Sequence, residues 1–364
     1  MVVVLQAILL GLAAGLTATL GMRLFGPVPG MIGGALFGIN SESAHYAHWL
    51  LSEVPFTFLL LAVLVLALRC QSGQRQADFV ACGIGLGLAT MMRVIAGALV
   101  IPLSLGLVLS ATGRSRRQRA QQIGLLVIGF SVVIAPWVGR NLDTFGQVTF
   151  SSRLGGNLIR RAARAAEPLD AYPAWLAASV WMATNPLSNL VYPISRFQWG
   201  PENEDNLIWD FHVNDQVRYI GRYEPVCQAR PDTDACYAEI GLAFVQAYPI
   251  GYAVQSFFAL VLLLFAPLPG PQALEHNGLV WLGLIGMFGM FASRRLGSPH
   301  WLVLGLLGAY VGASIVVDTQ VRYLLPVLPI FAVFGGVPAA RALAAASRVG
   351  RQAVRSRTPV QAAE

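Results

Sequence analysis

The chain has 364 residues, of which 55% are hydrophobic and only 12% charged, and its mean hydropathy is +0.60. Because soluble domains carry about 25% charged residues, this composition excludes an ordinary soluble protein and indicates an integral membrane protein. The net charge of +7 comes from arginine alone, since the chain contains no lysine. In a membrane protein such an excess indicates orientation, and the basic residues lack the aromatic interleaving of a nucleic-acid-binding surface.

Six apolar segments precede residue 140, and a spanning helix needs about 20 apolar residues. They cover 1–21, 28–47, 50–68, 79–92, 94–111 and 123–138. The first has no basic residue before Arg23 and no small-residue cleavage site, which predicts a spanning helix rather than a removable signal peptide. The two short segments around Arg93 predict a helical hairpin whose tip lies below the membrane surface.

A polar, proline-punctuated stretch begins at Arg140, where the preceding apolar segment ends, and we expect a loop domain over 140–250. Two moderately apolar pieces, 174–191 and 252–267, could be additional spans or lie at the membrane surface, and we favour the surface. Three further apolar segments follow over 278–291, 301–317 and 324–340, and the chain ends in a basic tail over 341–364.

These segments predict an all-α integral membrane protein, a bundle of about nine spans with a polar loop domain outside the membrane. We expect six spans in 1–139, including the short hairpin 79–111, and three in 251–340 beside an interfacial helix over 252–267. With the N-terminus outside, the cytoplasmic links and the tail hold fourteen arginines and two acids, against eleven arginines and sixteen acids opposite. This asymmetry follows the positive-inside rule and makes 341–364 cytoplasmic.

Unusual polar residues gather on the predicted outer face, where ionisable groups at membrane depth are candidates for function. Glu53, in S-E-V-P, is either a helix cap or a site residue. Arg93 could extend to the surface or bind a lipid phosphate through its forked donors, and we favour the phosphate. His45 and His48 share a helical face, which suits a wet interface better than a metal pair.

Four cysteines form two pairs in the sequence. Cys227 and Cys236 lie nine residues apart in the polar insertion, and this spacing allows either a disulfide or two free thiols. Cys70 and Cys82 flank a membrane segment, which favours buried thiols. Neither pair has the C-x-x-C spacing of a metal or redox site.

Several short motifs occur in a characteristic order: R-L-F-G at Arg23–Gly26, Y-A-H-W-L-L-S-E at Tyr46–Glu53, G-L-A-T-M-M-R at Gly87–Arg93, P-W-V-G-R-N-L-D-T-F-G at Pro136–Gly146, then S-S-R-L-G-G-N-L, and R-Y-L-L-P-V-L-P at Arg322–Pro329. In this order the chain resembles polyprenyl-phosphate-sugar-dependent glycosyltransferases of the GT-C class. The resemblance is to family 39 in particular, which includes protein mannosyltransferase-like and aminoarabinose transferase-like enzymes.

The resemblance implies a GT-C-like bundle in a bacterial cytoplasmic membrane, with its active face extracytoplasmic. A sugar would pass, with inversion, from undecaprenyl- or decaprenyl-phosphate to a lipid, glycan or protein acceptor. An acid would act as general base, and basic groups would neutralise the departing phosphate. No cofactor is implied, and a divalent metal is an open alternative that no motif supports. The candidate donor-binding residues are Arg93, Arg140, Asn141, Arg322, Tyr323 and His48.

One departure from that family concerns the base. The principal catalytic acid of the family lies in a first outer loop, after an N-terminal span that we expect to be missing here, so Glu53 or Glu42 would have to substitute. A truncated or inactive member is therefore an expectation too, as is a non-catalytic lipid-phosphate-binding subunit. A transporter is less favoured, because we find no internal repeat and no charge pair at the membrane midplane.

Overall fold

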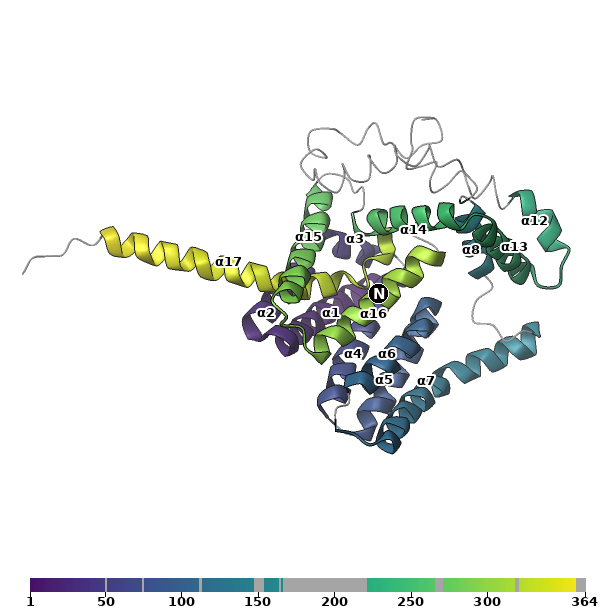
Figure 1. Ribbon diagram of the computed structural model, residues 1–364, viewed down its shortest axis with the longest axis horizontal. Coiled ribbons are helices and arrows are strands. Elements are labelled where there is room, and N and C mark those ends of the chain that lie inside the picture. The colour runs from purple at the N-terminus through teal and green to yellow at the C-terminus, as the bar shows by residue number, and fades with distance from the viewer. Residues whose placement is uncertain are drawn as a thin grey trace, which may run out of the picture.

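The computed structural model describes residues 1–49, 51–73, 75–110, 113–146, 154–163, 165, 221–265, 271–317 and 321–357. Regular structure in these ranges is helical throughout, without a strand, which confirms the all-α prediction (Figure 1). The helices are α1 (Val2–Phe25), α2 (Pro27–Gly38), α3 (Ser41–His48), α4 (Glu53–Ser72), α5 (Gln76–Met92), η1 (Val94–Leu99), α6 (Val100–Ser110), α7 (Arg116–Phe145), α8 (Leu154–Ala163), α12 (Gly221–Gln228), α13 (Thr233–Ala247), α14 (Pro249–Leu264), α15 (Pro271–Ala292), α16 (Ser298–Val317), η7 (Val321–Tyr323) and α17 (Leu328–Arg357).

Five helices of the described chain are long and apolar enough to cross a membrane: α1, α4, α7, α16 and α17. The stretches α2, α5 and η1–α6 are apolar but shorter, and α15 carries polar residues in its first two turns. By length and composition, the described chain therefore has five candidate spans, or six if the bent pair α13–α14 is one span, and the expectation of about nine spans stays a prediction.

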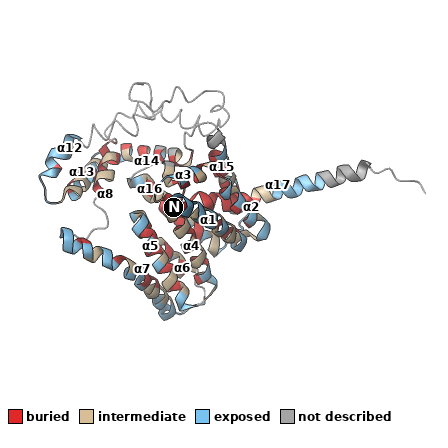
Figure 2. Ribbon diagram, turned by 180° about the vertical axis from the view of Figure 1, so that it is seen from behind, coloured by how far each residue is buried: buried red, intermediate tan, exposed pale blue. Residues whose placement is uncertain are grey.

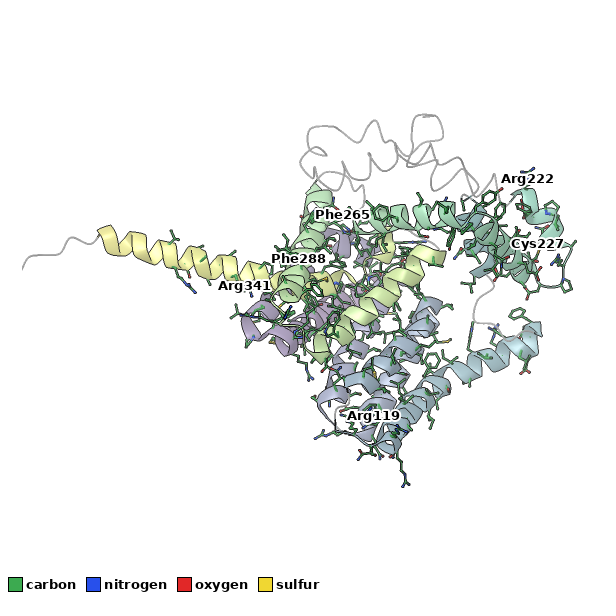
Figure 3. The ribbon with its side chains drawn as sticks, viewed as in Figure 1. Arg119, Arg222, Cys227, Phe265, Phe288 and Arg341 are labelled. Atoms are coloured by element: carbon green, nitrogen blue, oxygen red, sulfur yellow. A yellow bond between two sulfur atoms is a disulfide. The ribbon has the colours of Figure 1, made fainter. Side chains whose placement is uncertain are left out.

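One end of the bundle collects the arginine-rich links. Arg114 Nη2 donates hydrogen bonds to the carbonyl oxygens of Cys70, Gln71 and Gly73 at 3.2, 3.1 and 3.0 Å, which joins the α6–α7 link to the α4–α5 link. Gln71 Nε2 donates to Ser298 O at 3.4 Å, so the start of α16 lies there as well. This end is called the arginine-rich end below. In Figure 3, Arg119 marks it, far from Cys227.

Close helix contacts depend on small residues, as in other membrane bundles. A Cβ at Gly83 in α5 would collide with the backbone of Leu126 in α7, and one at Gly33 in α2 with the backbone of Ala332 in α17. Because these glycines let backbones touch, even the 12-residue α2 is held firmly between α1 and α17.

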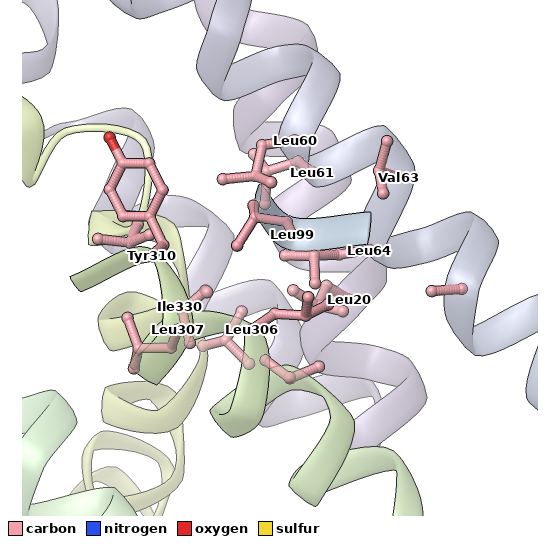
Figure 4. Close-up of a cluster of buried hydrophobic side chains, with 14 of the residues drawn as sticks. Leu20, Leu60, Leu61, Val63, Leu64, Leu99, Leu306, Leu307, Tyr310 and Ile330 are labelled. Carbon is pink, nitrogen blue, oxygen red and sulfur yellow. The ribbon is translucent and has the colours of Figure 1, made fainter. Parts of the chain in front are cut away.

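A single large core lies where α1, α4, η1, α6, α16 and α17 meet. Figure 4 shows Leu20, Leu61, Leu99, Leu306 and Tyr310 from four of these elements around it. Figure 2 shows the contrast between this buried centre and the exposed outer helices. The core therefore fixes the relative positions of α4, the α5–η1 junction and the α16–α17 link.

Two expected boundaries differ from the structure. The segment predicted over 28–47 is broken at Ile39–Asn40, where Asn40 Oδ1 accepts a hydrogen bond from Ser43 N at 3.0 Å and starts α3. The helix predicted to end at 138 continues through Pro136 to Phe145 and stops at Gly146, whose φ of 67° is left-handed. Arg140 and Asn141 therefore lie in α7 and do not open a loop.

The outer part of the described chain contains α8, α12, α13 and α14. Cys227 and Cys236 form a disulfide between α12 and α13, with their Cα atoms 5.4 Å apart. α14 covers most of the expected interfacial helix and meets α13 in a 99° bend at Tyr248, the geometry of a broken span or a re-entrant piece. The piece predicted over 174–191 lies outside the described residues.

Candidate functional site

The first acidic candidate, Glu53, is the first residue of α4 and lies at the end of the bundle opposite the arginine-rich end. A carboxylate in the first turn of a helix is favoured by the helix dipole. Its side chain is only 4% exposed, which a charged group tolerates when it is paired and hydrogen-bonded. The sequence left a cap and a site as alternatives for Glu53, and its position in α4 is compatible with both.

Arg93 supplies the first partner. It separates α5 from η1 in an extended conformation with φ −147° and ψ 119°, so its side chain leaves the helical path at the tip of the predicted hairpin. Its Nη1 donates to Glu53 Oε1 at 3.1 Å. Its guanidinium also lies over the Tyr323 ring, 4.2 Å from the centroid, and near the Phe56 ring at 5.9 Å. These contacts hold Arg93 on three sides.

Arg322 supplies the second partner, from the link between α16 and α17. Its Nε lies 3.6 Å from the same Glu53 Oε1, and its guanidinium carbon is 5.7 Å from the Tyr323 centroid. One carboxylate is thus shared by two guanidinium groups, and the three side chains carry one net positive charge. Glu53 Oε2 is buried and has no hydrogen-bond partner in the described chain. Such an oxygen costs free energy unless a ligand or water contacts it.

The second acidic candidate, Glu42, lies in α3 and is also buried. It contacts His276 Nδ1 from α15, and both side chains are at most 5% exposed. The neighbouring Glu275 accepts a hydrogen bond from Ser41 N at 3.0 Å, so α15 meets the start of α3 at two points. His276 Nε2 is buried without a hydrogen-bond partner in the described residues. An imidazole held by a carboxylate at one nitrogen is a recurrent arrangement for proton transfer at the other.

Tyr46 in α3 links the two acidic groups. Burial raises the pKa of its phenol above the ordinary value of 10.0, and the charges of Glu42 and Glu53 raise it further, whereas Arg322 lowers it. One phenol therefore lies within electrostatic range of both carboxylates and of Arg322. The Glu53 and Glu42 groups belong to one polar region at this end of the bundle.

Sequence reasoning missed His276. The apolar segment was expected to start at Gly278, so the polar triplet Glu275–Asn277 remained in the link before it, although α15 includes it. His276 and Asn277 are at most 1% exposed. The available signal was three polar residues directly before an apolar run, in the first two turns of a membrane helix.

Arg140 and His48 make their contacts within their own helices, apart from the Glu53 group. Arg140 Nη1 donates to Asn141 Oδ1 at 3.2 Å, and its guanidinium lies over Trp137 and near Phe145, all within α7. His48 is exposed, and its Nδ1 lies 2.8 Å from Ala44 O in its own helix. The prediction that these residues line the same cavity as Arg93 stays a prediction.

Metal ligands do not cluster in the part of the chain that the structure describes. No group of three or more histidine, cysteine or carboxylate side chains there could hold a metal ion. Glu42 and His276 make only a pair, fewer than the three or four protein ligands usual for zinc.

The family model described as "Dolichyl-phosphate-mannose-protein mannosyltransferase" matches residues 1–138, from α1 into α7. This match supports a membrane glycosyltransferase of the GT-C type, and it covers Glu42, Glu53 and Arg93 but not His276 or Arg322. No curated protein and no solved structure matches the chain significantly.

Proposed function

We propose that the chain transfers a sugar from a polyprenyl-phosphate donor to an acceptor hydroxyl at the end of the bundle opposite the arginine-rich end. The observation that carries the proposal is the carboxylate of Glu53 shared by Arg93 and Arg322. A polyprenyl-phosphate sugar is a phosphodiester with one negative charge, and these three side chains carry one positive charge. Guanidinium groups bind phosphate oxygens through paired N–H donors.

The reaction increases the negative charge at this place. The bond between the sugar anomeric carbon and the phosphate oxygen breaks, and its electron pair stays on the phosphate, which becomes a dianion. The acceptor oxygen forms the new bond to the anomeric carbon and loses its proton to a base. Preorganised cations beside the departing phosphate stabilise the charge that develops. Arg93 and Arg322 would supply them.

The two acids have different roles in this proposal. Glu53 contacts both arginines, so protonation of its Oε1 would disrupt the ion pairs that position them. We therefore assign Glu53 to neutralising one of the two arginine charges and not to accepting the proton, and the Tyr323 ring also orients Arg93. Glu42 holds His276 at Nδ1 and leaves Nε2 without a partner among the described residues, which suits the base.

The face of the membrane follows from charge. Under the positive-inside rule the arginine-rich end is cytoplasmic, and the Glu53 group then lies on the extracytoplasmic side. The disulfide between Cys227 and Cys236 supports this orientation, because disulfides persist in oxidising compartments. The family match supports the reaction class, and the donor lipid and this orientation are part of the proposal.

The test is a transfer assay on the full chain in proteoliposomes, with undecaprenyl- and decaprenyl-phosphate sugars and separate measurement of polyprenyl-phosphate binding. We expect Glu42→Gln and His276→Asn to reduce turnover about 10²–10⁴-fold without changing donor affinity. Arg93→Gln and Arg322→Gln should instead weaken donor binding. Absence of turnover for a folded protein whose lipid binding is insensitive to Arg93→Gln would overturn the proposal. Arginine-dependent binding without turnover would indicate a non-catalytic lipid-phosphate-binding subunit.

A further inference from the structure

The second half of α17 leaves the bundle as a helix. Residues from Leu328 to Val337 are buried, whereas every residue from 341 to 349 is exposed. Gly336 packs against the backbone of Pro29, just after the turn between α1 and α2, so α17 passes the end of its neighbours within about one further turn. Figure 1 shows α17 extending well beyond the other helices.

This projecting segment has two different faces. Arg341, Arg348 and Arg355 are seven residues apart and occupy one face of a helix, since seven residues make nearly two turns. The positions of Leu343, Ala346 and Val354 fall on the other side. Leu343 is 61% exposed, so no described part of the chain covers this side.

All the charged residues of the segment are positive. Between residues 341 and 357 the sequence has five arginines and no acid. The segment begins at the level where the neighbouring helices end and the other arginine-rich links lie, which is the membrane surface for a spanning bundle. A helix with an arginine stripe, an apolar side and this location matches an interfacial helix on anionic lipid.

We propose that residues 341–357 lie along the membrane surface, with the face of Arg341 and Arg348 toward anionic lipid headgroups and the side of Leu343 and Ala346 toward the headgroup–acyl boundary. α17 is one continuous helix in the structure, and Pro338 is the place where it could bend at the membrane surface, because proline removes a backbone donor inside the helix. A nucleic acid or an acidic protein would use the arginines but would leave the apolar side in water. The observations therefore favour the lipid surface.

The experiment uses the full chain in nanodiscs with one spin label, either at Ala346→Cys on the apolar side or at Ala344→Cys on the arginine side. The native cysteines are buried or form the disulfide, so the new thiol is the accessible one among the described residues. In phosphatidylcholine discs containing phosphatidylglycerol, we expect the label at 346 to be more accessible to oxygen and less accessible to an aqueous nickel chelate than the label at 344. In pure phosphatidylcholine discs the two labels should converge.

Charge variants separate lipid binding from simple exposure. Each arginine near an anionic surface increases membrane partitioning about fivefold. The variant R341Q/R348Q/R351Q/R355Q should therefore remove the difference in accessibility between the two labels even in anionic discs. The matched control R222Q/R230Q changes charges in the outer part of the chain and should leave it intact. Equal accessibility of the two labels in anionic discs would overturn the proposal. So would a difference that arises only after RNA or an acidic protein is added. The lipid comparison needs no arginine variant, so it stands even where the quadruple variant fails to fold.

Discussion

Replacing Glu53 by glutamine tests whether its two arginines receive a phosphate. The side chain is 4% exposed and lies 3.1 Å from Arg93 Nη1 and 3.6 Å from Arg322 Nε. Removing one partner of a buried ion pair costs about 3–5 kcal/mol, because the remaining charge is left unpaired. The Arg322 side chain is 35% exposed and water screens part of its charge, so the lower end applies. We expect Glu53→Gln to lose about 3 kcal/mol of stability.

A bound donor should recover part of this loss. In the wild type, Glu53 repels the donor phosphate by about 1–2 kcal/mol across a few ångströms of partly screened surroundings. In Glu53→Gln that repulsion disappears, and Arg93 remains oriented by the Tyr323 ring 4.2 Å away. Polyprenyl phosphate should therefore bind the variant about tenfold more tightly, which adds about 1.4 kcal/mol of stabilisation at saturating lipid.

The assay is thermal unfolding of the full chain in nanodiscs, with and without polyprenyl phosphate. The variant should have the lower Tm without lipid and the larger rise in Tm with it. Glu42→Gln is the matched control, because it neutralises the other buried acid, and its lipid-induced rise should equal that of the wild type. A lipid-induced rise in Glu53→Gln that equals or falls below the wild-type rise would refute the phosphate site.

Three further changes probe the surroundings. Arg140→Gln should change polyprenyl-phosphate affinity by less than about twofold by equilibrium binding, because its contacts lie in α7, and a loss as large as for Arg93→Gln would place Arg140 in the site. Cys227→Ser opens a small loop and should lower the stability of the α12–α13 unit by about 2–3 kcal/mol, seen as faster proteolysis there. Tyr46→Phe should reduce the fall in Tm as pH rises past 10. The raised pKa keeps this phenol neutral when folded while the unfolded chain ionises, so stability is lost above the ordinary value.

The sequence predicted the bundle well because apolar segments separated by arginine determine membrane topology with few alternatives. The hairpin tip at Arg93 was predicted from two short segments, and the structure shows that break between α5 and η1. The break at Asn40 could have been inferred from its residue type, since asparagine is a preferred N-cap.

The end of α7 was harder to predict because proline and arginine were read as the start of a loop. Pro136 is tolerated inside a membrane helix, where neighbouring groups can satisfy the freed carbonyl. The true stop signal is Gly146, which adopts a left-handed conformation that other residues rarely adopt. Arg140, expected at the start of the loop domain, consequently lies within a helix.

The pairing of these side chains could not be predicted from the sequence, for a physical reason. Glu53, Arg93 and His276 were each visible as ionisable residues near predicted membrane ends, but which acid meets which base depends on helix rotation and on close glycine contacts. The Glu42–His276 pair needs α15 to begin in the polar triplet before Gly278. The apolar periodicity of the sequence does not indicate this earlier start of α15, because the polar triplet interrupts the apolar pattern.

Arg322 determines whether the Glu53 group is an anion-binding site or only a structural ion pair. Glu53 and Arg93 alone are neutral together and have no net attraction for a phosphodiester, so the positive charge depends on Arg322. Arg322→Gln leaves the 3.1 Å pair intact and should cost less than about 1 kcal/mol of stability. It should nevertheless weaken polyprenyl-phosphate binding about 10–100-fold, the value of a charged hydrogen bond. Arg93→Gln should lose both stability and polyprenyl-phosphate binding, because it leaves Glu53 buried with only the more distant Arg322 as a cation. Both Tm and the Kd for polyprenyl phosphate should be measured for each variant. Wild-type lipid affinity in Arg322→Gln would contradict the assignment of the positive charge to Arg322.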